Sequence, residues 1–224
     1  MRVPVSSGGL RDLADLGRLI TAVVAPPVCT SCGAEAAAEP LCGQCRGALR
    51  WLAPEPARAT GVEAWAPLAY DGPARAMVSA LKFRGAAGLS RTMAAQIAAV
   101  APPGWLEDGV LVPVPLHAAR LRRRGFNQAE LLAASLADRT GLGLSDCLER
   151  RGRGTTQVGR GRAERAEAIE GAVTARPGTL VPVRAMVVDD VVTTGATLAA
   201  CTRALRAAGA RSVRAVAYAR TPGR

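Results

Sequence analysis

Apolar runs and amphipathic segments alternate along most of the 224-residue chain. Short apolar runs are typical of strands buried on both faces of a sheet, whereas apolar residues at helical spacing are typical of helices that cover such a sheet. The pattern predicts strands near 64–70, 109–114, 145–149, 171–175, 184–189 and 212–219. It predicts helices at about 74–83, 89–100, 127–140 and 196–208. This alternation indicates an α/β fold with a mostly parallel sheet flanked by helices.

One of the predicted buried strands ends on two adjacent acids. The segment MVVDDVVTTGATL (186–198) places Asp189 and Asp190 at the carboxyl end of this strand, which is the edge where parallel sheets bind ligands. Burying two neighbouring carboxylates is costly unless they face hydroxyls, basic groups or a hydrated metal. The residues that follow, TTGAT (193–197), lead into a predicted helix and offer hydroxyls, backbone amides and the positive end of a helix dipole, which together suit a phosphate. We therefore predict a sugar-phosphate site; the alternative is an acidic turn with a threonine N-cap, which is common at helix starts.

The length and composition of the chain limit the classes of protein that remain. A chain of 224 residues with 49% hydrophobic residues and a mean hydropathy of +0.14 suits one sizeable globular core with a small appendage. The sequence holds no apolar run near the ~18 residues that span a bilayer, and its N-terminus does not match a signal peptide, so we expect a cytoplasmic protein. Residues 10–24 carry apolar side chains at helical spacing and predict a helix that packs on the main domain or, alternatively, binds a partner.

Four of the six cysteines form two CxxC pairs, CTSC (Cys29, Cys32) and CGQC (Cys42, Cys45). This spacing is typical of a small zinc ribbon in which four thiolates hold one ion. A disulfide pair and a redox CxxC are the alternatives, but structural disulfides are rare in the cytoplasm and a redox motif needs a single pair. Four protein ligands leave no open position for a catalytic water, so we expect a structural zinc site.

The net charge of +11 is concentrated in the middle of the chain, where arginine is abundant and Lys82 is the only lysine of the sequence. Such a field attracts polyanions, either nucleic acid or a pyrophosphorylated metabolite. The segments 113–117 and 150–162 each follow a predicted strand, and we expect them to converge with the DDVVTTGAT segment at one edge of the sheet. The sequence contains no GxxxxGK[ST] motif, which argues against a nucleotide triphosphatase.

The segment DDVVTTGAT resembles the binding motif for phosphoribosyl pyrophosphate (PRPP) of type I phosphoribosyltransferases. The double CxxC, AYDGPARAMVSALKFRG (69–85) and VPVPLHAARLRRRGFNQAELLA (112–133) resemble segments of one branch, the ComF family. The resemblance covers roughly residues 26–220. It implies a type I phosphoribosyltransferase fold with an N-terminal zinc ribbon. The implied domains are an N-terminal helix at 1–25, a zinc-ribbon module at 26–50 and a phosphoribosyltransferase-like domain at 60–224.

The resemblance also implies roles for individual residues. It places the ribose hydroxyls on Asp189 and Asp190, the implied catalytic residues, and the 5′-phosphate on the loop that follows. The implied PRPP-binding set is Asp189, Asp190, Val191, Thr193, Thr194, Gly195, Ala196 and Thr197. The implied pyrophosphate loop contains Pro115, Leu116, His117, Arg120, Arg124 and Gly125.

Four further residues have two readings each. Lys82 either extends from a helix towards solvent or contacts pyrophosphate. His117, the only histidine, shapes the loop and is not expected to act as a base. Asn127 and Gln128 are expected to cap a helix that begins at Phe126, with a direct role in the site as the less favoured reading.

Residues 151–170 occupy the place of a mobile lid in the phosphoribosyltransferase fold, with Thr155, Gln157 and Arg162 as implied ligands of a polyanion. The segment departs from the family pattern at Arg160, Ala166, Ala168 and Val173. Losing polar groups from a lid affects catalysis more than binding of PRPP.

These observations lead to two functional hypotheses. The first is a Mg²⁺-dependent transfer of ribose 5-phosphate from PRPP to an unknown nitrogen acceptor, linked through the resemblance to DNA uptake and natural competence. Acceptor contacts are expected from residues 50–105. The second is a non-catalytic adaptor that binds single-stranded DNA or competence and recombination proteins, although three tryptophans, two tyrosines and two phenylalanines offer few platforms for base stacking.

Overall fold

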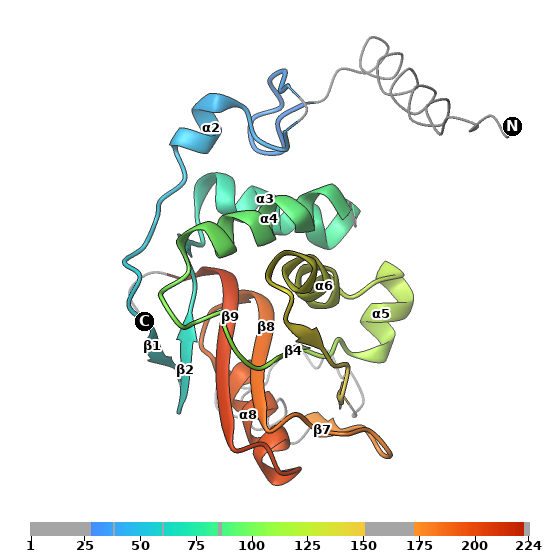
Figure 1. The fold of residues 1–224 in the computed structure, drawn as a ribbon. Coiled ribbons are helices and arrows are strands. Elements are labelled where there is room, and N and C mark those ends of the chain that lie inside the picture. The colour runs from blue at the N-terminus through green and yellow to red at the C-terminus, as the bar shows by residue number, and fades with distance from the viewer. Residues whose placement is uncertain (1–27, 38, 60, 85–86, 151–172, 222–224) are drawn as a thin grey trace, which may run out of the picture.

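A seven-stranded sheet forms the centre of the molecule (Figure 1). The computed structural model describes residues 28–37, 39–59, 61–84, 87–150 and 173–221. The main path of the sheet runs in the order β1 (Ala57–Ala59), β2 (Val62–Trp65), β9 (Ser212–Arg220), β8 (Arg184–Val192), β4 (Val110–Pro113) and β5 (Gly143–Leu144), and β3 (Leu68–Ala69) also pairs with β9. Every pairing in this sheet is parallel except that of β1 with β2. The α/β class with a mostly parallel sheet is therefore confirmed.

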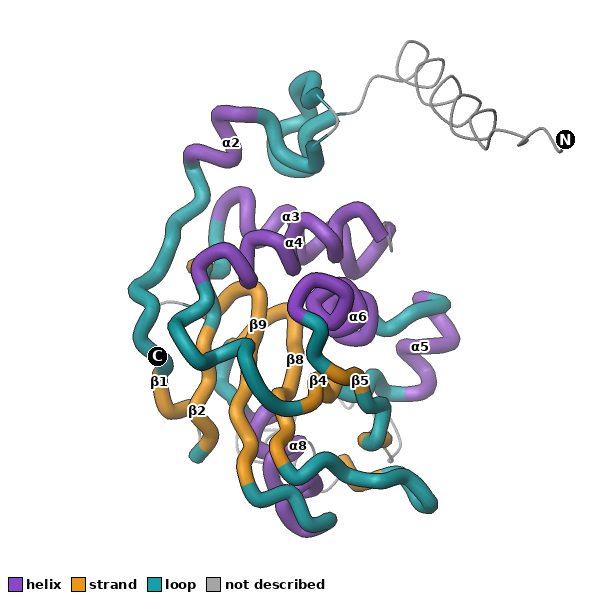
Figure 2. The backbone as a smooth tube through the Cα atoms, in the orientation of Figure 1, coloured by secondary structure: helices purple, strands orange, loops and turns teal. Residues whose placement is uncertain are grey.

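Helices cover both faces of the sheet (Figures 1 and 2). One face carries α3 (Gly72–Arg84), α4 (Ala87–Val100) and α6 (Gln128–Thr140), and the opposite face carries α8 (Ala196–Ala207). Strand β8 alternates between the two layers, because Met186 and Val188 pack under the first group of helices while Ala185 and Val187 pack against α8. Because the sheet is buried on both faces, both sides of each strand are apolar, and the strands therefore occur in the sequence as continuous apolar runs.

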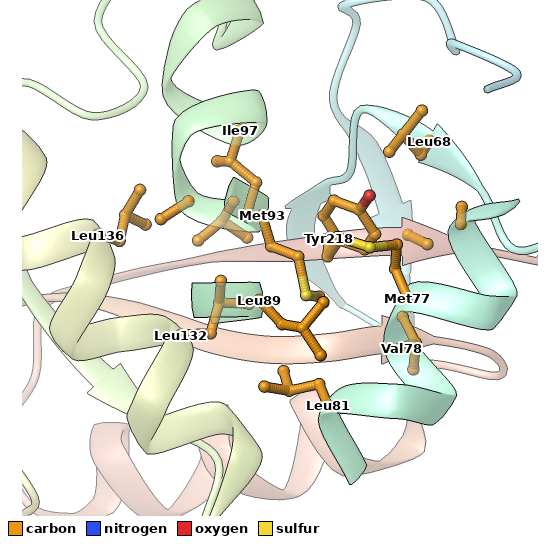
Figure 3. Close-up of a cluster of buried hydrophobic side chains, with 14 of the residues drawn as sticks. Leu68, Met77, Val78, Leu81, Leu89, Met93, Ile97, Leu132, Leu136 and Tyr218 are labelled. Atoms are coloured by element: carbon orange, nitrogen blue, oxygen red, sulfur yellow. The ribbon is translucent and has the colours of Figure 1, made fainter. Parts of the chain in front are cut away.

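The larger core lies between the sheet and the three helices of the first face (Figure 3). Its fully buried side chains include Met77, Met93, Leu132 and Tyr218, and the Tyr218 hydroxyl lies 2.7 Å from Gln96 Oε1. Burial raises the pKa of Tyr218, so the hydroxyl keeps its proton and donates this hydrogen bond. The contact links β9 to α4 and satisfies a polar group within the apolar layer.

The cysteine-rich segment packs on the same core. Buried Cys29, Leu41 and Leu49 belong to one hydrophobic cluster with residues of β3, α3 and α4. The short helix α2 (Gly43–Gly47) lies in this segment. Trp51 pairs with Leu68 in an antiparallel bridge, so the chain that leaves the cysteine segment is held against β3.

Several elements differ from the prediction. Strands β6 (Leu148–Arg150) and β7 (Val173–Ala175) form a separate antiparallel pair instead of joining the main sheet, because three-residue runs carry no signal for their partner. Helix α5 (Ala118–Arg124) occupies most of the predicted pyrophosphate loop. Its one large apolar residue, Leu121, is 41% exposed, so the sequence has no apolar face from which this helix could be predicted. Strand β1 follows the Pro-rich stretch and was also not predicted.

The predicted N-terminal helix at 10–24 and the predicted lid at 151–170 lie outside the described residues. Among the helices that are described, none combines the length and apolar character needed to cross a membrane.

Candidate functional site

The two acids lie inside strand β8, close to its carboxyl end. The strand continues to Val192, beyond its predicted end at residue 189, because Val191 and Val192 still pair with β9. Asp190 is 4% exposed, and its backbone N–H donates to Asp189 Oδ1 at 2.8 Å. Burial raises the pKa of Asp189 well above its usual range, and the adjacent charge of Asp190 raises it further. Two neighbouring carboxyl groups in this setting need a cation or hydrogen-bond donors to remain ionised.

Lys82 supplies one such cation from the neighbouring helix α3. Its Nζ lies 3.0 Å from Asp190 Oδ2, and its side chain is 25% exposed. The charge of Lys82 lowers the pKa of Asp189, which opposes the effects of burial and of Asp190. The Oδ2 atom is buried and accepts no hydrogen bond of regular geometry from the described residues, so it retains capacity for a donor. Neither reading of Lys82 anticipated this contact with the acid pair, and its contact with pyrophosphate stays a prediction.

The hydroxyl-rich segment follows directly and begins helix α8. Thr193 and Thr194 are exposed, and Gly195 is the N-cap residue with a φ of 78°, a backbone conformation that favours glycine. Because glycine offers no capping side chain, the nearest substitute is Thr194 Oγ1, which accepts from the Ala196 N–H at a long 3.4 Å. The alternative of a threonine N-cap is therefore wrong. The first turn of α8 presents amides without partners inside the helix, as an anion site requires.

The segment after β4 lies beside the acids. The Val114 N–H donates to the carbonyl of Val188 at 2.9 Å, which places the start of this segment next to the strand that carries Asp189. His117 caps helix α5, and its Nδ1 accepts from the Ala119 N–H at 3.2 Å. Residues Pro115 to Gly125 are thus a short loop and a helix, not the open loop that we predicted. The shaping role expected for His117 agrees with this geometry.

Asn127 connects this segment to helix α6. Its Oδ1 accepts from the Ala129 N–H at 3.1 Å and caps the helix, as expected, although the helix begins at Gln128 and not at Phe126. Its Nδ2 donates to the carbonyl of Val114 at 3.0 Å. The two bonds hold the end of β4 and the start of α6 at a defined distance from each other.

Arginines surround the acids. Arg124 donates to Gln128 Oε1 at 2.9 Å, its guanidinium lies 5.9 Å from the centre of the Phe83 ring, and it is close enough to Asp190 for the two charges to interact. Arg150, at the end of β6, interacts with Asp189 in the same way. Burial lowers the pKa of both Arg124 and Arg150, and the nearby charge of Arg120 lowers it further. This concentration of positive charge around two acids suits a pyrophosphate.

Arg150 begins the segment 150–162 that we expected at this edge of the sheet, although it was not singled out as a site residue, and Phe83 was not predicted. Arg150 stands in an arginine-rich stretch, and the sequence does not indicate which of these arginines lies at the site. An exposed phenylalanine at a helix end gives no indication in the sequence that it lies near a site. The predicted lid ligands Thr155, Gln157 and Arg162 lie outside the described residues.

The four cysteines of the two CxxC pairs come together in space. The sulfur atoms of Cys29, Cys32, Cys42 and Cys45 all lie within 4.8 Å of one another, and those of Cys32 and Cys42 are 3.8 Å apart. Sulfurs bound tetrahedrally at about 2.3 Å from one zinc ion would be about 3.8 Å apart, so this cluster fits such a metal. Gly33 adopts a φ of 75° after the first pair, a backbone conformation that favours glycine, whereas Gly43 begins helix α2.

No protein-family model matches the chain. Two solved structures show a partial likeness, each at 24% identity over 57% of this chain: an allosteric regulatory enzyme of purine biosynthesis (TM-score 0.35) and the glutamine PRPP amidotransferase of B. subtilis complexed with ADP and GMP (TM-score 0.36). The chain spans about a quarter of the length of these two enzymes, 24% and 25%.

A curated relative covers far more of the chain. Competence protein F of Haemophilus influenzae is 27% identical over 206 residues, which are 86% of this chain and 90% of that protein. The chain is a homologue of Competence protein F, and the resemblance to the ComF family is thereby confirmed.

Proposed function

We propose that this protein binds PRPP together with Mg²⁺ and transfers ribose 5-phosphate to a nitrogen acceptor. The observation that carries the proposal is the pair Asp189 and Asp190 at the carboxyl end of a central strand, with the hydroxyl-rich start of α8 directly after it. Two adjacent acids suit the two neighbouring hydroxyls of a ribose, and the helix start suits the phosphate one step beyond. Calorimetric titration with PRPP and Mg²⁺ tests it, and absence of binding would contradict it.

The residues of the site have distinct tasks in this reaction. Asp189 and Asp190 accept hydrogen bonds from the ring hydroxyls and stabilise the positive charge that develops on the ribose as pyrophosphate leaves. Arg120, Arg124 and Arg150 stabilise the departing pyrophosphate. The carboxylate and hydroxyl oxygens gathered here are the ligand type that Mg²⁺ prefers, and the bound ion would neutralise charge on the leaving group.

Lys82 is expected to favour the ionised form of Asp189 in the free protein. Replacing Lys82 with methionine should raise the pKa of Asp189, because the ammonium of the wild type lowers it. As the solution is acidified, Lys82→Met should therefore lose affinity for PRPP at a higher pH than the wild type does. At alkaline pH the affinities of the two proteins should converge. Titration calorimetry between about pH 5 and pH 9 measures this shift.

The arginine variant is the control for Lys82. Lys82→Arg keeps the charge and should return the pH profile to that of the wild type. A uniform loss of affinity at every pH in Lys82→Met would instead indicate a direct contact with the ligand or a general structural effect.

A second candidate function is a single-stranded DNA or protein adaptor on the same scaffold. One observation favours it: helix α5 exposes Arg120, Arg122 and Arg123, and beside it Phe83 is 75% exposed with Arg124 over its ring. Cationic and aromatic groups in this arrangement suit a nucleic-acid strand. Fluorescence anisotropy with labelled oligonucleotides should show an affinity that falls as salt rises, and that falls further in Arg122→Gln with Arg123→Gln. Absence of binding at low salt would remove the basis for this function.

A further inference from the structure

A cavity of about 190 Å³ lies next to the hydroxyl-rich segment and is separate from the acid pair in its lining residues. Its walls come from β1, β2 and the carboxyl ends of β8 and β9. Thr193 and Thr194 line it on the side of the proposed phosphate loop. Part of its wall therefore belongs to the segment from which acceptor contacts were expected, residues 50–105.

Two arginines give this cavity a positive charge. Glu63 lies opposite Arg58 in the register of β1 and β2, but its ion pair among the described residues is with Arg214. Arg58 of β1 and Arg220 at the end of β9 line the cavity, and neither forms an ion pair with the described residues. Elsewhere in the described structure, arginines such as Arg176 and Arg184 are paired with aspartates. Two arginines on one cavity without such partners are suited to a bound anion.

A buried indole adds a second feature. Trp65 lines the cavity and is 2% exposed, and its Nε1–H donates to no acceptor among the described residues. A buried N–H group without a partner costs free energy that a ligand acceptor can recover. Next to Trp65, Ala64 and Ala66 of the same segment form an apolar part of the cavity wall.

We infer that this cavity binds the acceptor substrate and that the acceptor is a small anionic ring compound, a single nitrogen-containing ring that carries a carboxylate. The charge follows from Arg58 and Arg220, and the acceptor atom on the ring follows from the unpartnered N–H of Trp65. The size follows from the volume, because an apolar cavity of about 150 Å³ is known to hold benzene. A cavity of about 190 Å³ thus accommodates one six-membered ring with a small substituent. The role as acceptor rests on the proposed function, whereas the binding of an anionic ring does not.

Matched pairs of ring compounds test the inference. Nicotinate and orotate are the anionic probes, and nicotinamide and uracil are their neutral counterparts. Calorimetry on the full chain, with and without PRPP and Mg²⁺, should show at least tenfold tighter binding of an anionic probe than of its neutral counterpart. Ring binding should also change tryptophan fluorescence, and this change should be lost in Trp65→Phe.

Charge variants locate the binding. The double variant Arg58→Gln with Arg220→Gln should lose the preference for the anionic probe but bind PRPP within about twofold of the wild type. The matched control is Arg206→Gln with Arg211→Gln, which removes the same charge from exposed positions away from the cavity and should keep the preference. Melting temperatures establish that each variant is folded.

The outcomes separate this inference from the proposed function. Binding of PRPP without any preference for an anionic ring, or a preference that survives the loss of Arg58 and Arg220, would overturn the inference and leave the proposed function standing. An anionic ring that binds through these arginines to a protein that does not bind PRPP would support the cavity as a site for such rings and contradict the proposed reaction.

Discussion

Replacing both Asp189 and Asp190 with asparagine is expected to reduce the affinity for PRPP by about 10²–10⁴-fold. Each acid is proposed to accept a hydrogen bond from a ribose hydroxyl, and a hydrogen bond to a charged group contributes about 1.5–3 kcal/mol. Two such bonds correspond to about 3–6 kcal/mol, and 1.4 kcal/mol corresponds to about a tenfold change in a binding constant. Titration calorimetry at neutral pH with saturating Mg²⁺ measures the loss.

The asparagine variants keep the shape of the side chains, so a loss of affinity reports on charge and hydrogen bonding. The single variant Asp189→Asn should not lower the melting temperature of the free protein, because it removes a buried charge whose pKa is raised by burial and by Asp190. Asp138→Asn, on the exposed side of α6, removes the same charge and should leave the affinity unchanged. Retention of wild-type affinity in the double variant would mean that PRPP, if it binds, does not lie on these acids.

Replacing Cys29 or Cys45 with serine is expected to remove the bound metal and to lower the melting temperature strongly. We propose that the metal is zinc and that its role is structural. Structural zinc sites in small peptides contribute about 10–16 kcal/mol of apparent binding free energy at neutral pH, which in such modules is also the free energy of folding. Because Cys29, Leu41 and Leu49 share a hydrophobic cluster with the core under β3 and α3, loss of the metal should also loosen that part of the core.

Metal analysis and thermal unfolding together test this prediction. The wild type should contain about one zinc ion per chain, and the cysteine-to-serine variants should contain almost none. The remaining thiols provide the control: Cys147 and Cys201 are fully buried on the other face of the sheet, and Cys147→Ala and Cys201→Ala should retain the metal even where they lower stability. A full metal content in Cys29→Ser would show that the four sulfurs do not hold the ion.

The sequence predicted the fold class and most elements, because strands buried on both faces and helices that cover them leave distinct periodic patterns. Helix α6, predicted at 127–140, is observed at Gln128–Thr140, and helix α8, predicted at 196–208, is observed at Ala196–Ala207. The same local signals predicted the cysteine cluster, since the ligands of each pair are neighbours along the chain. Helix α5 escaped prediction because its exposed arginines form no apolar face.

Contacts between residues far apart in the chain could not be predicted in this way. The sequence marked Lys82 as its only lysine, but the crossing of α3 over the end of β8 decided that its ammonium lies against Asp190. The pairing of β6 with β7 brought Arg150 near Asp189. Strands of three residues are too short for their sequence pattern to predict which strand they pair with.

The sequence by itself therefore determined which chemical groups the protein carries at its strand ends: the acid pair, the hydroxyl-rich segment and the two cysteine pairs. Only the tertiary structure decided which charges face one another and which remain unpaired. Arg58 and Arg220 are separated by more than 160 positions, yet β1, β2 and β9 bring them to one cavity. The physical reason is that periodicity and motif spacing report on neighbours along the chain, whereas ion pairs and cavities depend on the register and packing of the whole sheet.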